Sequence, residues 1–120
     1  MKPMGLPITK HEDERRVLTE WIKDIPFKRC KVLEMKQKSV VGNHYHMNND
    51  SIFYVLKGRG KYILQSIEPR SKKIIGWIFE GDCIFVPREI IHTFTLLAGT
   101  IMLEACSEPY DEKDEIPIFE

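Results

Sequence analysis

The chain contains 120 residues, of which 42% are hydrophobic and 30% are charged. This length provides one domain with a substantial core, and this composition is typical of a folded globular protein rather than a disordered one. The 18 lysines and arginines balance the 18 aspartates and glutamates. The sequence therefore lacks the basic excess that favours nucleic acid or an anionic membrane, and it predicts neither as a partner.

The apolar runs, the first ten residues and the cysteines of the sequence support further expectations. No apolar run reaches the roughly 20 residues of a membrane-spanning helix, and MKPMGLPITK lacks the apolar centre of a signal peptide. We therefore expect a cytoplasmic protein. Cys30, Cys83 and Cys106 lie far apart and form no CxxC pair, which predicts buried thiols rather than a disulfide framework or a zinc ribbon.

Residues 1–29 are predicted to form an arm that precedes the main domain. Residues 1–12 contain two prolines and a glycine and are expected to be extended. Residues 13–25 fit two patterns, because their apolar residues follow the spacing of a helix and the run VLTEWI is equally typical of a strand. Both alternatives stay open. Pro26 ends the segment, since proline has no N–H to continue a helix or a ladder.

Residues 30–106 are predicted to form an all-β domain. They contain eight short runs rich in β-branched and aromatic residues, separated by turn sequences such as NND, EGD and AG. The runs cover residues 30–35, 39–46, 51–56, 61–67, 74–79, 83–86, 92–97 and 100–105. Eight short strands with no helix between them predict an antiparallel sandwich or barrel.

The last residues, SEPYDEKDEIPIFE (107–120), form an acidic tail with an apolar end. The DEKDE part is predicted to be a solvated, frayed terminus. The closing IPIF is apolar enough to dock against the rim of the barrel or against a partner subunit instead.

Two histidines, His44 and His46, lie two residues apart in one predicted strand. Residues i and i+2 of a strand face the same way, about 6.6 Å apart by backbone rise, so both imidazoles can turn towards one metal ion. Such a pair also occurs at packed or exposed positions without an ion. His92, at the start of another predicted strand, is a third histidine and makes a metal site the stronger interpretation.

These histidines belong to two spaced motifs, G-x5-H-x-H-x3-4-E-x6-G and G-x5-P-x-G-x2-H-x3-N. The matching positions are His44, His46 and Gly58 in the first motif, and Gly81, Pro87 and His92 in the second. With these motifs, residues 30–106 resemble the cupin superfamily and its RmlC-like jelly roll. The resemblance implies a single-domain cupin β-barrel, or double-stranded β-helix, preceded in the chain by the N-terminal arm and followed by the acidic tail.

The sequence departs from both motifs. Ser51 occupies the position of the motif glutamate, and Asp50 can replace that glutamate only through a bulge or turn, because a shift of one residue reverses the face of a strand. Glu89 and Leu96 replace the glycine and the asparagine of the second motif. The predicted ligands of a divalent ion (zinc, iron, nickel or manganese) are therefore the three histidines and water, with Ser51 a weaker candidate. Alternatively, the histidines act as acid or base without a metal, or simply pack.

Several residues near the motifs are candidates for contact with a substrate. By strand alternation Phe53 shares the face of Ser51, and Phe94 shares the face of His92, which predicts an apolar pocket wall. Tyr54 and Tyr62 lie close to the first motif and are further candidates. Glu104 is a carboxylate among apolar strand residues, so it either faces outwards or is buried with a partner.

Two further segments indicate a class of substrate. DERRVLTEWI resembles the opening of sugar-nucleotide cupins, and GNHYH together with SEPYD is similar to the cupin domain of capsular-polysaccharide sugar-nucleotide reductases. The resemblance implies an isomerase or epimerase that moves a proton next to the carbonyl of a nucleotide-linked sugar. His44, His46, His92 and Glu104 are then the catalytic candidates.

Two other functions stay open: a metal-dependent dioxygenase, and a non-catalytic sugar-binding or sensory cupin. The family resemblance also implies a homodimer, with the arm before Cys30 contributing to the subunit interface.

Overall fold

The computed structural model describes residues 4–6, 8–23 and 25–118, which form β-strands and one short 3₁₀ helix. The elements are β1 (Met4–Gly5), β2 (Thr9–Glu12), β3 (Val17–Glu20), β4 (Arg29–Glu34), β5 (Ser39–Tyr45), β6 (Ser51–Lys57), β7 (Arg59–Ser66), β8 (Ile74–Phe79), β9 (Cys83–Val86), β10 (Ile90–Leu96), β11 (Ile101–Cys106), η1 (Glu112–Asp114) and β12 (Ile116–Pro117). The strands β4 to β11 confirm all eight predicted strands, each within two residues of its predicted bounds.

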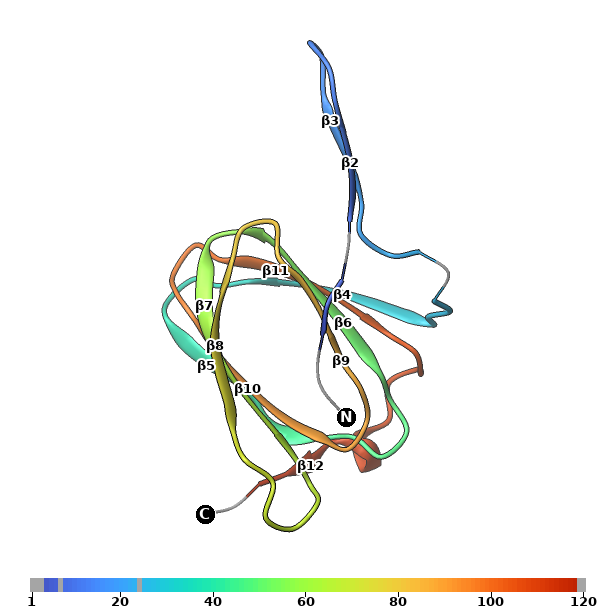
Figure 1. Ribbon diagram of the computed structural model, residues 1–120, viewed down its shortest axis with the longest axis vertical. Helices are drawn as coiled ribbons and strands as arrows, with labels where there is room; N and C mark the ends of the chain where they lie inside the picture. Colours follow the sequence, from blue (N-terminus) through green and yellow to red (C-terminus); the bar gives the residue numbers. More distant parts are fainter. Residues whose placement is uncertain (1–3, 7, 24, 119–120) are drawn as a thin grey trace.

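Two antiparallel five-stranded sheets face each other and enclose the core (Figure 1). One sheet has the strand order β1-β9-β6-β11-β4, and the other has the order β12-β5-β10-β7-β8. From β4 to β11 every connection except the one between β7 and β8 crosses from one sheet to the other, as in a jelly roll. The prediction of an all-β cupin barrel is therefore confirmed.

The residues of β10 show how local alternation builds this core. Ile90, His92, Phe94 and Leu96 are buried, whereas the three residues between them are only partly buried. Side chains from both sheets meet the inward face of β10. The buried cluster comprises Phe53, Val55, Leu64, Ile78, Val86, Ile90, Phe94, Leu96 and Met102.

Within the predicted N-terminal arm, the described residues form a strand and a hairpin. β1 pairs with β9 and so extends a barrel sheet, while β2 and β3 form a hairpin that projects beyond the barrel (Figure 1). The strand alternative for residues 13–25 is confirmed over Val17–Glu20, and the helical alternative is wrong. Trp21 then stacks on Tyr54 with ring centroids 5.7 Å apart, so this segment covers the outer face of β6.

The acidic tail folds back onto the barrel. η1 and β12 follow one another, and β12 pairs with β5 through Ile116 and Pro117. Asp114 is buried, although its three preceding residues are exposed. The prediction of a solvated, frayed DEKDE segment is therefore wrong at Asp114, and the alternative of docking on the barrel rim is the one that the structure shows. Phe119, in the closing IPIF, lies outside the described residues.

Two simpler expectations concern cysteines and membrane spans. Cys83 and Cys106 are buried as predicted, but Cys30 is exposed, because it points outwards from the edge strand β4. All three cysteines are free. Across the residues that the structure describes, there is no helix with the length and apolarity needed to span a membrane.

Candidate functional site

A β-bulge in β5 brings His44 to the inside of the barrel. The pairing of β5 with β10 joins Thr93 to Gly42 but His92 to His44, so Asn43 is an extra residue. Gly42 and Asn43 have φ angles of 91° and 62°, a left-handed conformation that glycine and asparagine adopt most readily. Because the bulge reverses the alternation of β5, His44 shares the inward face of His92.

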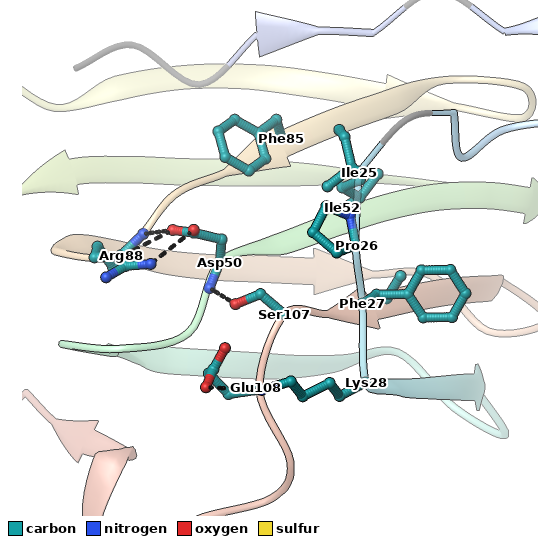
Figure 2. A pocket seen from close by; sticks show the side chains of 11 residues that line it. Ile25, Pro26, Phe27, Lys28, Asp50, Ile52, Phe85, Arg88, Ser107 and Glu108 are labelled. Carbon is teal, nitrogen blue, oxygen red and sulfur yellow. Dashed lines mark hydrogen bonds and ion pairs between the residues drawn. The ribbon is translucent and has the colours of Figure 1, made fainter.

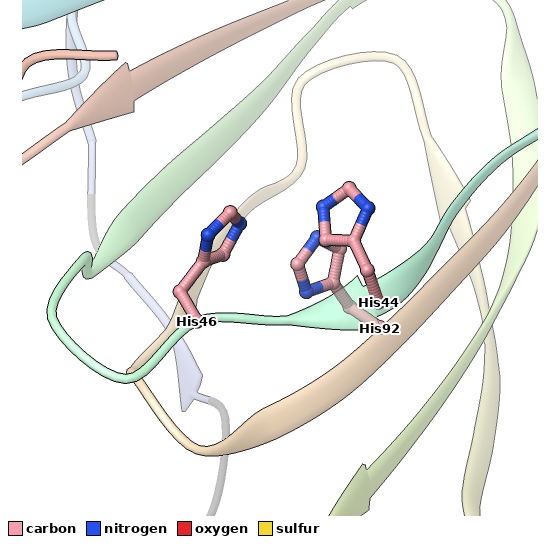
Figure 3. A group of neighbouring side chains, drawn as sticks. All are labelled: His44, His46 and His92. Atoms are coloured by element: carbon pink, nitrogen blue, oxygen red, sulfur yellow. The ribbon is translucent and has the colours of Figure 1, made fainter. Parts of the chain in front are cut away.

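Three imidazoles meet at this point, as the sequence predicted (Figure 3). The ring centroid of His44 lies 4.8 Å from that of His46 and 4.6 Å from that of His92. The ring centroids of His46 and His92 are 5.6 Å apart. One ring nitrogen from each residue lies within 4.8 Å of the others. The chain thus places three nitrogen ligands around one small volume inside the barrel.

Backbone carbonyls orient two of these rings. Nδ1 of His46 lies 2.8 Å from the carbonyl oxygen of Asp114, and Nδ1 of His92 lies 3.3 Å from the carbonyl oxygen of Ile90. A neutral imidazole that donates its Nδ1–H to a carbonyl keeps a lone pair on Nε2. Nε2 is therefore the free acceptor of both histidines.

Burial keeps His92 and His44 neutral. It lowers the pKa of His92 to about 3, and the neighbouring His44 acts in the same direction. Burial, followed by the proximity of His46, also lowers the pKa of His44. Neutral imidazole is the form that binds a metal ion or accepts a proton.

The four aromatic candidates are placed differently. Phe53 and Phe94 pack together with ring centroids 4.7 Å apart, and both lie about 6 Å from the ring of His92, so they form an apolar floor. Tyr62 shares this inward face, but its hydroxyl lies over Gly76 of the next strand. Tyr54 points to the opposite face of β6 against Trp21, so the structure does not bring it to the histidines.

Ser51 and Glu104 form a buried polar pair on the wall opposite the histidine strands. Oγ of Ser51 donates to Oε2 of Glu104 over 2.7 Å, and Nζ of Lys31 lies 3.0 Å from Oε1. Burial raises the pKa of Glu104, but Lys31 and the hydrogen bond from Ser51 outweigh burial, so the net pKa is below its usual value. Glu104 is therefore a buried carboxylate with partners, which is one of the two predicted alternatives.

Asp50 does not replace the missing motif glutamate. Its carboxylate accepts hydrogen bonds from the backbone N–H, Nε and Nη2 of Arg88. It lines a hollow of about 460 Å³ on the outer face of the sheet, with Ile52 and Phe85 (Figure 2). Asp50 and this hollow are therefore separated from the three histidines by the sheet itself.

Two residues of the site were not found by sequence reasoning. In the sequence Lys31 is indistinguishable from an exposed lysine of a strand. Only the pairing of β4 with β11 places it opposite Glu104. Asp114 lies in the tail, where its carboxylate accepts from the backbone N–H groups of Met47 and Asn48, directly after His46. The apolar IPIF that follows Asp114 was the available signal that this tail docks.

The three histidines fit a divalent metal ion. Backbone carbonyls orient two of the rings so that a ring nitrogen is left free, and the spacing of the three nitrogens is close to the span of two nitrogens that bind one ion at about 2.1 Å each. Glu104 and Asp50 are outside this group of ligand atoms. A bound ion would therefore have three imidazole ligands.

Comparison with known proteins identifies the class of this chain. A family model described as Cupin matches residues 30–95, more than half of the sequence. The chain therefore belongs to the cupin family.

Two curated relatives match part of the chain. One is an uncharacterised protein from Aquifex aeolicus, 32% identical over 76 residues, which are 62% of this chain and 57% of the relative. The other is acireductone dioxygenase 1 from Vitis vinifera, 37% identical over 76 residues, which are 63% of this chain and 39% of the relative. The match thus spans less than two thirds of the length of each of these two relatives.

Solved structures with the same fold cover nearly the whole chain. A TDP-fucose-3,4-ketoisomerase from Campylobacter jejuni has a TM-score of 0.80 and 21% identity, and covers 97% of this chain and 89% of its own. A 3,4-ketoisomerase from Helicobacter canadensis has a TM-score of 0.82 and 18% identity, with 98% and 92% covered. An RmlC epimerase from Mycobacterium tuberculosis has a TM-score of 0.83 and 16% identity, with 97% and 68% covered. At these identities the likeness establishes the fold.

Proposed function

We propose that this cupin is an enzyme that binds a divalent metal ion through His44, His46 and His92 and moves a proton next to the carbonyl of a polar substrate. The observation that carries the proposal is the convergence of three imidazoles inside the barrel. When bound, the ion would polarise a carbonyl oxygen and favour the negative charge that develops there.

The side chains around the histidines support a proton-transfer chemistry. A histidine that binds the ion through its lone pair cannot take up a proton there, so an imidazole serves as general base only in the metal-free form, in which His44 is the least buried of the three histidines. Phe53 and Phe94 exclude water from one side of the site. Glu104, held ionised by Lys31 and Ser51, is a second group able to hold a proton near the substrate.

The proposed substrate class is a nucleotide-linked keto sugar. Its support is the whole-chain likeness to 3,4-ketoisomerases and epimerases, one of which was solved with TDP-4-keto-6-deoxyglucose bound. The sequence segments DERRVLTEWI and SEPYD point to the same class.

The test combines metal analysis with proton exchange. Protein purified without an affinity metal is analysed for bound metal, and TDP-4-keto-6-deoxyglucose is incubated with it in deuterated water. We expect stoichiometric metal and deuterium uptake next to the carbonyl, both lost in His44→Ala and both kept in His11→Ala, whose histidine is exposed on the hairpin. Deuterium exchange by protein that contains no metal would indicate that the histidines act as acid or base without an ion. Absence of both metal and exchange would refute the proposal.

A second candidate is a metal-dependent dioxygenase. It is favoured by the 37% identity with an acireductone dioxygenase over 76 residues, which are 63% of this chain. Oxygen consumption that requires added ferrous ion, and that is lost in His92→Ala, would select this candidate. Saturable sugar-nucleotide binding without turnover or oxygen uptake would instead select a non-catalytic binding cupin.

A further inference from the structure

The strand β8 exposes an apolar face at the edge of its sheet. It pairs with β7 on one side, and it is the last strand in the order β12-β5-β10-β7-β8. Ile75, Trp77 and Phe79 alternate on its outer face and are 59%, 60% and 51% exposed. In Figure 1, β8 runs alongside β7 on one wall of the barrel, away from the N-terminal hairpin.

This edge carries none of the usual protection. The run IIGWIF contains no charged residue and no proline, and natural edge strands use such residues to prevent pairing with other chains. Four of the exposed large hydrophobic residues in the described part of the chain lie on this one strand, which is the density expected of an interaction surface rather than of scattered exposure.

The free main-chain groups of β8 can be assigned. The N–H of Phe79 donates to the carboxylate of Asp82, and its carbonyl accepts from the N–H of Asp82, so both groups point away from β7. Alternate residues of an antiparallel strand direct these groups to the same side. Trp77 and Ile75 therefore present their N–H and carbonyl groups to the open edge, while Phe79 is already engaged.

The charges that flank β8 are complementary to those of a second β8. Lys72 and Lys73 precede the strand, and Glu80 and Asp82 follow it, all of them exposed. Two copies of this strand in antiparallel orientation place the basic end of each beside the acidic end of the other. Parallel pairing would instead bring like charges together.

We propose that β8 pairs antiparallel with β8 of a second copy of this chain and joins the two sheets across a twofold axis at Gly76. In this register Ile75 lies opposite Trp77 of the second copy on the same outer face. The main-chain N–H and carbonyl groups that these two residues direct to the open edge then form the hydrogen bonds between the two strands. Lys72 then lies opposite Glu80 of the second copy at both ends. One partner thus pairs with the open edge of β8 and brings its own exposed apolar residues beside those of the first copy.

The first experiment measures the oligomeric state by sedimentation equilibrium at micromolar concentration. We expect the wild-type chain to dimerise, and Trp77→Glu to weaken dimerisation at least about thirtyfold, since it places a charge at the centre of the interface. Val32→Glu alters a valine of similar exposure on the other sheet and should leave the dimer intact. A monomeric wild type, or a dimer that Trp77→Glu does not weaken, overturns the proposal.

The second experiment reverses the charges at the ends of β8, which leaves its apolar residues and the fold unchanged. Lys72→Glu and Glu80→Lys should each weaken the dimer, and the double variant should restore it, because the pair is re-formed with opposite polarity. Circular dichroism confirms folding of each variant. Val17→Glu changes an exposed residue of the N-terminal hairpin and tests the alternative that the N-terminal arm forms the subunit interface. If Val17→Glu dissociates the dimer and the β8 variants do not, the proposal is overturned.

Discussion

Ser51 donates a hydrogen bond of 2.7 Å to Glu104, which lies 53 residues later in the chain. Ser51 occupies the position where the cupin motif has a glutamate, and β11 is the next strand of the same sheet. Glu104 therefore supplies a carboxylate to this wall from a different strand. Because the carboxylate is paired with Lys31 and lies outside the group of ligand nitrogens, it contributes a fixed charge rather than a fourth ligand.

Glu104→Gln should lower stability without lowering metal content. The substitution leaves Lys31 without its ion partner, and since Lys31 is 40% exposed, water compensates part of this loss, which gives a cost of about 1 to 2 kcal/mol. Chemical denaturation measures the free energy of unfolding. Glu34→Gln, at the exposed end of β4, is the matched control and should have little effect. Loss of metal in Glu104→Gln would show that Glu104 acts as a ligand.

The metal-free protein should lose stability as the pH falls below 6.5. The pKa of His92 is about 3 in the folded state and about 6.5 when unfolded, so between these values only the unfolded state takes up the proton. Stability thus falls with decreasing pH, by about 1.4 kcal/mol for each pH unit from this residue, and this contribution vanishes above pH 6.5.

Denaturation in the presence of a chelator measures this slope. His92→Gln should have a shallower dependence than the wild-type chain between pH 6 and about 4, where the carboxylates begin to contribute. His11→Gln changes an exposed histidine and should keep the wild-type slope. Identical slopes for all three proteins would mean that His92 titrates normally in the folded state.

Asp114→Ala should weaken metal binding although Asp114 is not a predicted ligand. The carboxylate holds the backbone of Met47 and Asn48, and the Asp114 carbonyl orients His46, so the substitution loosens the tail against the site. Loss of such an orienting partner lowers metal affinity about tenfold or more. Competition with a chromophoric chelator measures the affinity, and Glu112→Ala, an exposed residue in the same turn, should keep it. Equal metal affinities of the wild-type chain and Asp114→Ala would show that the tail does not support the metal site.

Gly42→Ala should disturb the site more than Gly99→Ala, although both glycines have a φ angle above 80°. A Cβ atom at Gly99 meets no atom within 4 Å, so the substitution costs only the backbone strain, about 1 to 2 kcal/mol. At Gly42 the Cβ would lie 2.6 Å from the carbonyl oxygen of His92, which must then move. We expect a larger loss of stability together with reduced metal content, and equal effects would show that the bulge tolerates a side chain.

The barrel strands and the histidine site could be predicted because their signals are local. Alternation of apolar residues along a strand, such as Ile90 to Leu96, follows from the two-residue repeat of the backbone and needs no knowledge of neighbours. The spacing of His44, His46 and His92 within two motifs was also readable from the chain. The bulge at Gly42 and Asn43 was not anticipated, yet it is the reason that His44 faces inwards.

The sequence by itself thus determined that this protein is an all-β cupin with three histidines as its candidate site. The tertiary structure decided that Asp114 supports His46, that Lys31 forms an ion pair with Glu104, and that Tyr54 lies on the far face of its sheet. The reason is physical: these contacts join strands or segments far apart in the chain, so their free energy depends on sheet order and register. Residue patterns within one strand carry no information on which distant strand becomes its neighbour.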